Sequence, residues 1–352
     1  MAIEIRPFSA EWRNSLREFN ARLAATGTPL PEDPDAEMQP GSTMYVAVED
    51  GAVRGGYILR PQTFSIRGAL RRVAHFRLPV SEGAVNRAYA RVGPLLVRSA
   101  LQAEPLLYAL GMRGFDRPLP RLLGAMGWSV SSIPLFFRVA RPARFLRGIR
   151  AAREARWRAS LMDLAAWTGT GWIGLRGWQW ARSLQPRGGI EWDTADDFGS
   201  WADEVWGAAQ AEYGMTAMRD ARTLSELYPA GNKRFVRVRV NSRGWAVVLD
   251  TAMEGDRYFG DLRVGTIVDS MARPRDAAAV IHAARRYLEG RGVDVIVSNQ
   301  SHAAWGAALR ADGFFAGPSN FLFAASKELA ALGVPATEMH MNRGDGDGPV
   351  HL

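Results

Sequence analysis

The sequence predicts an α+β protein with two mixed-sheet domains in tandem, and three observations support this fold class. A chain of 352 residues is long for a single domain, so two domains are expected. The hydrophobic content of 47% is sufficient for two cores. Residues 264–314 have the order strand, helix, strand, helix, and the end of the first half has the same order. The matched order predicts an internal duplication of the fold.

The clearest predicted unit is a parallel βαβ crossover within residues 264–314. Its first strand is apolar and reaches Asp269, and a helix follows from Pro274, a residue that suits the first helical turn. Two glycines end this helix before a second buried strand and a short helix. Ligands of such units bind near the C-terminal ends of the strands, here at residues 269–276 and 298–302.

The first half predicts the order β-α-β-β-β-α-β-α-β. These elements are expected at residues 3–7, 9–26, 42–49, 52–66, 71–80, 87–102, 105–112, 118–128 and 133–140. Asp50-Gly51 has the composition of a hairpin turn. In the second half, we expect residues 321–329 to form the closing strand and residues 337–342 to form another.

The expected domain organisation has three parts. They are an N-terminal domain at 1–140, an Arg/Trp-rich helical connector at 141–190 and a C-terminal domain at 191–352. The final RGDGDG segment has Asp345 and Asp347 but lacks an EF-hand ligand set, so we expect a flexible tail there.

The positive charge is concentrated in the predicted connector. The net charge is +8, and eight Arg and one Glu lie between Arg138 and Arg158. The rest of the chain is close to neutral, which argues against a nucleic-acid-binding surface. Two interpretations of the cluster are open. One is an exposed connecting helix, and the other is contact of Arg144–Arg158 with an anionic membrane surface, a glycan or a partner.

Tryptophan is also concentrated near the connector, with eight residues between Trp157 and Trp206. Packing in a core or between domains is one interpretation, because an indole buries a large area. A platform for stacking a carbohydrate is the other.

Several classes of protein are excluded by composition. The chain has no Cys, which rules out disulfides, a Cys nucleophile and Cys-ligated zinc. It has no run of about 18 apolar residues and no apolar segment after its N-terminus, so a cytoplasmic protein is expected. HExxH, GxSxG, Walker and GxGxxG patterns do not occur, and no metal site is expected.

Both halves resemble the GNAT acyltransferase superfamily. The chain is most similar to tandem GNAT-type proteins of bacterial envelope and exopolysaccharide gene sets, which are distant relatives of Fem-type aminoacyltransferases. The resemblance rests on LPVSEGAVNRAYARVGPLLVRSAL and PLLYALGMRGFDRPLPRLLGAMGW in the first copy, and on EYGMTAMRDARTL, RVGTIVD and MNRGDGDGP in the second. It implies an N-acyltransferase that uses acetyl-CoA or another acyl-CoA as co-substrate.

The resemblance also implies a place for the cofactor. GNAT enzymes hold its pyrophosphate on backbone N–H groups in an Arg/Gln-x-x-Gly-x-Gly/Ala loop before a helix. The first copy has Ala88, Arg91 and Gly93 at the three patterned positions, and the second copy has Arg273, Asp276 and Ala278. An acid in the second loop would repel a phosphate. The candidate cofactor-binding residues are therefore Arg87, Arg91, Val92 and Gly93.

Three residues are candidates for catalysis. Many GNAT enzymes have an Asn before the last helix and a Tyr seven residues later, but this chain has His302 and Leu309 there, or Asp116 and Leu123 in the first copy. His302 is a candidate acid or base, with helix capping as the alternative.

Glu82, which follows a predicted strand, is a candidate base or a solvated loop acid. Asp269 ends the central strand of the second copy and is either functional or a helix cap. Arg219, next to Asp220, is expected to pair with that acid or with a substrate carboxylate.

The sequence thus favours an acyl-CoA-dependent N-acyltransferase for a small amine, such as an amino sugar or amino acid, that attacks the thioester directly. The alternative is a catalytically degenerate scaffold that binds a glycan, a membrane or a protein partner. Aminoacyl transfer from a charged tRNA is a third and less favoured interpretation.

Overall fold

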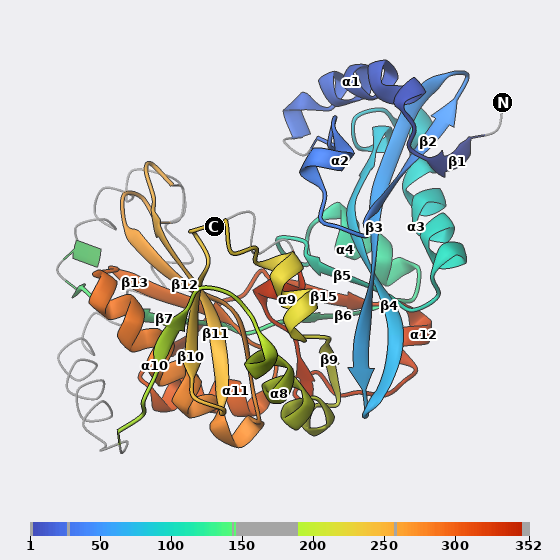
Figure 1. Ribbon diagram of the computed structural model, residues 1–352. Helices are drawn as coiled ribbons and strands as arrows, with labels where there is room; N and C mark the ends of the chain where they lie inside the picture. Colours follow the sequence, from blue (N-terminus) through green and yellow to red (C-terminus); the bar gives the residue numbers. More distant parts are fainter. Residues whose placement is uncertain (1–2, 27–28, 143, 146–188, 257–258, 347–352) are drawn as a thin grey trace. The chain divides into compact units, whose positions relative to one another are not determined.

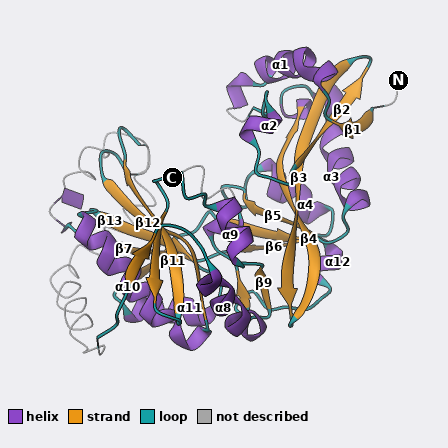
Figure 2. Cartoon of the chain, viewed as in Figure 1, coloured by secondary structure: helices purple, strands orange, loops and turns teal. Residues whose placement is uncertain are grey.

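The computed structural model describes residues 3–26, 29–142, 144–145, 189–256 and 259–346 (Figure 1). The chain forms two compact units. Unit 1 contains residues 1–64, 70–132 and 320–334, and unit 2 contains residues 65–69, 133–319 and 335–352. Each unit has a mixed sheet with helices packed on it, which confirms the predicted α+β class (Figure 2).

Unit 1 is built on a sheet with the strand order β1-β2-β3-β4-β5-β15-β6. The strands are β1 (Glu4–Pro7), β2 (Thr43–Glu49), β3 (Ala52–Ile66), β4 (Ala69–Ser81), β5 (Leu107–Gly111), β6 (Ser129–Ser132) and β15 (Leu322–Ala325). The α-helices are α1 (Arg13–Arg22), α2 (Pro34–Glu37), α3 (Val92–Ala103), α4 (Pro118–Ala125) and α12 (Lys327–Ala330).

Unit 1 has two apolar clusters. Leu16 and Phe19 of α1 are fully buried and pack with strand residues such as Val46 and Ile58. Residues of α3 and α4, among them Leu96, pack with alternate residues of the strands.

Unit 2 is built on a sheet with the strand order β14-β7-β13-β12-β11-β10-β8. The strands are β7 (Leu135–Val139), β8 (Asp193–Ala195), β10 (Val236–Val240), β11 (Gly244–Ala252), β12 (Arg263–Ala272), β13 (Val295–Asn299) and β14 (Phe315–Gly317). The α-helices are α8 (Ser200–Ala209), α9 (Ala221–Leu227), α10 (Ala277–Arg291) and α11 (Ala303–Ala311). Two short strands, β9 (Met215–Ala217) and β16 (Met339–His340), pair in parallel.

The predicted βαβ crossover is confirmed in unit 2. β12 and β13 are parallel, and α10 connects them. Gly292 ends α10 with φ of 80°, a left-handed conformation that glycine adopts without a steric penalty. One large core holds the alternate residues of the strands against α8, α10 and α11, and it includes Trp206 and Trp245. Trp206 thus packs in a core, which is one of the two interpretations given for the tryptophans.

The two units exchange strands, which the sequence did not predict. β7 pairs with β13 in the sheet of unit 2, although it was expected to close the first half. β15 pairs with β5 and β6 in the sheet of unit 1, although it was expected to close the second half. The expected linear division at residues 140 and 191 therefore differs from the observed units at these two strands. Periodicity identifies a strand but not its partner, so the exchange has no local signature.

Arg138, the first residue of the Arg cluster between Arg138 and Arg158, is not part of an exposed helix. Arg138 lies in β7 and is 9% exposed. Its Nε donates to Glu289 at 3.0 Å, and its Nη1 donates to the carbonyl of Asp312 at 3.0 Å. Residues 146–188 lie outside the described residues. They include most of the Arg cluster and five of the eight tryptophans. Docking through Arg144–Arg158 stays a prediction.

Candidate functional site

The two central parallel strands of unit 1 separate soon after they meet. β4 and β5 pair only at Ala74 with Leu107 and at His75 with Tyr108. β4 then continues to Ser81 without β5 as its partner, and we call this point the unit 1 divergence. Leu78, three residues on, has φ of 43°, an uncommon backbone conformation for a residue with a side chain. The backbone groups of β4 and β5 beyond this point are not used in pairing the two strands with each other.

The predicted cofactor-binding residues follow this strand. Arg87 lies in a short 3₁₀ turn, and Arg91 is the N-cap residue of α3. Both side chains are exposed, and Arg91 forms a long ion pair with Glu49 at 3.4 Å. The side chain of Val92 is fully buried in the core, so only its backbone is available to a ligand. Gly93 lies in the first turn, where an added Cβ would only touch a leucine side chain at 3.4 Å.

Glu82 is held by two cations. It is 4% exposed, and its carboxylate accepts hydrogen bonds from Arg22 and Arg54, both at 3.2 Å. These contacts join α1 and β3 to the turn after β4. The arrangement gives Glu82 a structural role, and its action as a base stays a prediction.

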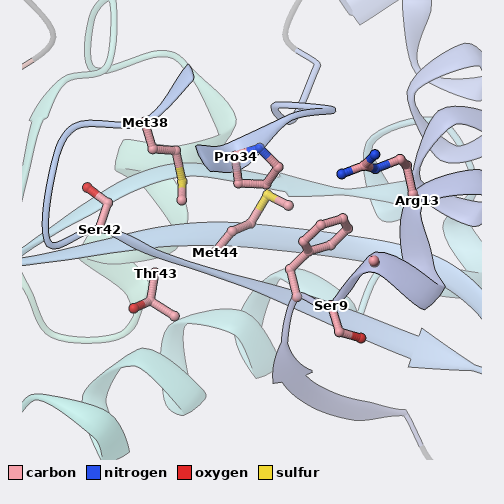
Figure 3. A pocket seen from close by; sticks show the side chains of 9 residues that line it. Ser9, Arg13, Pro34, Met38, Ser42, Thr43 and Met44 are labelled. Carbon is pink, nitrogen blue, oxygen red and sulfur yellow. The ribbon is translucent and has the colours of Figure 1, made fainter. Parts of the chain in front are cut away.

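A separate pocket of about 330 Å³ lies beside the start of α1 (Figure 3). Its walls combine apolar side chains, such as Met38 and Met44, with polar ones, such as Ser42 and the exposed Arg13. Met44 belongs to β2, and β3 and β4 stand between β2 and β5 in the sheet. The pocket is therefore two strands from the unit 1 divergence.

Unit 2 has the corresponding divergence, but its own chain occupies it. β12 and β13 pair from Val264 to Ile267, and a bulge at Val268 then alters the register of β12 with β11. The C-terminal segment 339–345, here called the tail segment, lies between the separated strands. On the β13 side, Ser301 N donates to Met341 O at 3.1 Å. On the β12 side, His340 Nε2 donates to Ser270 O at 2.7 Å.

A buried ionic network holds the tail segment. Arg219 donates from Nε to Asp269 at 2.8 Å and from Nη2 to Asp345 at 2.9 Å. Asn342 donates from Nδ2 to Asp269 at 2.9 Å, and Tyr228 donates its hydroxyl to the other Asp269 oxygen at 2.9 Å. All five side chains are almost fully buried. Asp269 is therefore fully engaged by protein groups, and its catalytic role stays a prediction.

The partners of Arg219 and the burial of Asp345 differ from what the sequence predicts. Arg219 pairs with Asp269 and Asp345, whereas its neighbour Asp220 caps α9 by accepting from Thr223 N at 2.8 Å. Asp345 was expected in a flexible tail, but it is 2% exposed. Burial raises the pKa of Asp345 to about 6, and the nearby Asp269 adds to the effect while Arg219 opposes it. Residues 343–345 are thus an ordered turn with Gly344 and Asp345 buried, and not a flexible tail.

His302 has the capping role considered for it. Its Nδ1 accepts from Ala304 N at 3.2 Å at the start of α11, and its ring meets Tyr213 edge to face. Burial lowers the pKa of His302, so the imidazole is neutral near pH 7. The two positions where a Tyr acid would lie, Leu123 and Leu309, are both fully buried in cores. An acid–base role for His302 stays a prediction.

In the part of the chain that the structure describes, no group of three or more His, Asp or Glu side chains is arranged to hold a metal ion. Every helix among those residues is too short or too polar to cross a bilayer.

Comparison with known proteins supports the fold. No family model and no curated protein sequence matches the chain. A solved protein of unknown function from Enterococcus faecalis, described as a probable N-acyltransferase, aligns over 94% of this chain and 74% of its own, with TM-score 0.55 and 11% identity.

Two further structures are similar. A GCN5-related N-acetyltransferase from Anabaena variabilis covers 92% of this chain and 72% of its own, with TM-score 0.54 and 9% identity. Saccharomyces cerevisiae N-myristoyltransferase with bound myristoyl-CoA aligns over 93% of this chain and 79% of its own, with TM-score 0.51 and 10% identity. The chain thus has the fold of GNAT-type N-acyltransferases. At these identities the likeness shows the fold alone.

Proposed function

We propose that the protein is an acyl-CoA-dependent N-acyltransferase whose donor site lies in unit 1. The observation that carries this proposal is the contrast between the two divergences. In unit 2 the tail segment hydrogen-bonds to both separated strands, at Asn299 of β13 and at Ser270 of β12. In unit 1, among the described residues, β4 has only β3 and β5 as neighbours in the sheet order. The backbone N–H and C=O groups at the unit 1 divergence are therefore the ones that can form hydrogen bonds with a pantetheine chain.

The segment after β4 supplies the phosphate-binding groups of this proposal. The positive end of α3 and the exposed Arg87 and Arg91 lie where the pyrophosphate would bind. Gly93 leaves the backbone open to close approach. The corresponding segment of unit 2 has Asp276 at the start of α10, next to Arg275 at 3.8 Å. A carboxylate at that position disfavours a phosphate.

The proposed reaction is direct transfer. The lone pair of a substrate amine attacks the thioester carbonyl carbon, a C–N bond forms, and the C–S bond breaks. Backbone N–H groups of the β4 segment beyond the divergence stabilise the developing negative charge on the carbonyl oxygen. The amine proton leaves to water, and the CoA thiolate takes a proton from solvent. Glu82 stays the side-chain alternative for the first proton transfer.

Binding of acyl-CoA tests the donor site. We expect acyl-CoA thioesters to raise the melting temperature of the intact protein, and chain lengths from acetyl to palmitoyl should be compared. Arg91→Gln removes one cation and should raise the Kd by about tenfold. Gly93→Ala adds a methyl group that the fold accommodates, so it should weaken binding without lowering stability.

The second copy offers a matched control. Arg275 lies in the turn before α10 and its side chain is 70% exposed, so Arg275→Gln removes a similar charge from the corresponding position of unit 2. We expect this variant to bind acyl-CoA like the wild type. No binding to any acyl-CoA at millimolar concentration would refute the proposed function. Loss of binding in Arg275→Gln alone would assign the donor site to unit 2.

A further inference from the structure

A polar cluster lies on one face of the unit 1 sheet, opposite α3. The side chains of a strand alternate between its two faces. Leu59 of β3 and Ala74 of β4 belong to the apolar cluster that packs on α3 and α4. Arg60 and His75, the next residues, therefore point to the opposite face. Tyr108 of β5 is paired with His75 and stacks on it, with ring centroids 4.5 Å apart and planes within 4°.

Two buried side chains of this cluster, Arg60 and His75, have nitrogens without a hydrogen-bond partner among the described residues. Arg60 is 3% exposed, and none of its three guanidinium nitrogens has a hydrogen-bond partner among the described residues. His75 is 1% exposed, and its Nδ1 has no partner in the same residues. Gln62, two residues after Arg60 on β3, donates to the Tyr108 hydroxyl at 2.5 Å.

Burial of a guanidinium without hydrogen bonds is unfavourable, and a folded protein normally supplies a counter-charge. The charged groups that act on His75 are Arg77 and Arg60 itself, and both are cations. Burial, then Arg77, then Arg60 lower the pKa of His75, so its ring is neutral and does not add to the positive charge. The missing counter-charge has to be an anion with oxygen acceptors, because a guanidinium offers a planar set of N–H donors.

The position of the cluster suggests which molecule carries the anion. His75 and Tyr108 are the last paired residues before the unit 1 divergence. The donor-binding segment Arg87–Gly93 leads into α3, which packs on the opposite face of the sheet. An anion at Arg60 is thus on the face away from α3 but next to the strands where the thioester is expected.

We propose that Arg60, with His75, binds an oxyanion of the acyl acceptor, a carboxylate or a phosphate, and so selects amines that carry one. The assignment to the acceptor rests on the proposed function, whereas binding of an oxyanion at Arg60 does not. The substrate class is then an amino acid, an acidic amino sugar or an amine phosphate.

Binding is tested first, without CoA. The melting temperature and the Kd are measured with sodium acetate and with sodium phosphate, against sodium chloride at equal ionic strength. We expect one oxyanion to stabilise the protein more than chloride does, and the two arms distinguish a carboxylate site from a phosphate site. Arg60→Gln should raise the Kd by about tenfold to hundredfold, because a charge-assisted bond is lost.

Two other variants make this test specific. Arg72→Gln is the matched control on the same strand as His75, since the Arg72 side chain is 66% exposed and pairs with Glu104. It should bind the oxyanion like the wild type. Arg60→Lys keeps the charge but loses the planar donors, and we expect intermediate binding.

The unliganded protein gives an independent readout. Arg60→Gln should melt at the same or a higher temperature than the wild type without oxyanion, because an unpaired buried charge is removed. A clearly lower melting temperature would show that Arg60 is satisfied within the fold, and would overturn the proposal. Equal stabilisation by acetate, phosphate and chloride would overturn it as well.

Acceptor use separates this inference from the proposed function. Pairs of amines that differ in one carboxylate, such as an amino acid and its decarboxylated amine, are compared as acyl acceptors. We expect Arg60→Gln to raise KM for the acidic member and to leave KM for the neutral member unchanged. Transfer to both members with equal KM would retain the acyltransferase and refute the acceptor assignment. Oxyanion binding without any acyl transfer would retain the site and refute the function.

Discussion

Arg219 donates a hydrogen bond to Asp345 at 2.9 Å, and this contact fixes the end of the described chain inside unit 2. Both side chains are 2% exposed or less. Because the same guanidinium also bonds Asp269 on β12, the ion pair connects the tail segment to the strand beside which it lies. The pair explains why the second divergence is occupied by protein rather than available to a ligand.

Removal of Asp345 should destabilise unit 2. Asp345→Ala leaves Arg219 with one carboxylate and the Asn342 backbone N–H without its acceptor. Breaking such a buried pair is expected to lower the free energy of unfolding by about 3 kcal/mol, measured by urea denaturation. Asp116→Ala, at an exposed position of unit 1, is the control and should change it by less than about 0.5 kcal/mol. Equal stability of the two variants would contradict a structural role for the tail segment.

A methyl group at Gly344 should displace the tail segment. An added Cβ would lie 2.5 Å from the Tyr228 hydroxyl and 2.6 Å from an Asp269 oxygen, and both atoms are held in the buried network. We expect Gly344→Ala to cost about 1–3 kcal/mol of stability. Gly207→Ala in α8, where nothing lies within 4 Å, should be neutral or stabilising. Hydrogen exchange of the tail amides would report whether the loss is local, and unchanged protection in Gly344→Ala would refute the prediction.

Stability should fall on mild acidification. Burial lowers the pKa of His75 and of His340 well below the ordinary value of 6.5, so the unfolded chain binds protons that the folded chain does not. The free energy of unfolding should thus be level above pH 6.5 and fall below it, by up to about 1.4 kcal/mol per pH unit for each His.

Asp345 acts in the opposite direction, because its pKa is raised from 3.8 to about 6. Its contribution weakens the folded state as pH rises from 3.8 to 6. Burial also lowers the pKa of His302, so His302 acts in the same direction as His75 and His340 below pH 6.5. Asp345 offsets part of this effect below pH 6. Urea denaturation from pH 5 to 8 measures the slope. His340→Gln should reduce the slope below pH 6.5, and an unchanged profile would show that His340 is not neutral in the fold.

Local patterns in the sequence predicted the elements well. Alternation and turn chemistry identified the strands, the hairpin at Asp50-Gly51 and the βαβ crossover, because these features depend on neighbours in the chain. Asp50 and Gly51 both have positive φ, as a two-residue hairpin turn requires. Strand partners depend on contacts between distant segments, so the places of β7 and β15 could not be found in this way.

The candidate site was predicted only in part. The contrast between Gly93 in the first copy and Asp276 in the second came from the resemblance to the GNAT loop pattern. The occupied divergence of unit 2 was missed because an RGDGDG sequence has the composition of a flexible tail. Arg60 and His75 have no distinct signal in the sequence, because other polar residues, such as Gln62 and Arg77, lie in the same strands.

The exchange of β7 and β15 has a consequence for dissecting the protein. A fragment of residues 1–145 carries β7 without β13, its partner, and it lacks the β15 strand that lies between β5 and β6. The complementary C-terminal fragment has the reverse defect. Each half expressed alone would thus expose unpaired strand edges, which promote aggregation. The two halves should instead behave as obligate complements, recovering native structure only when both fragments are present together.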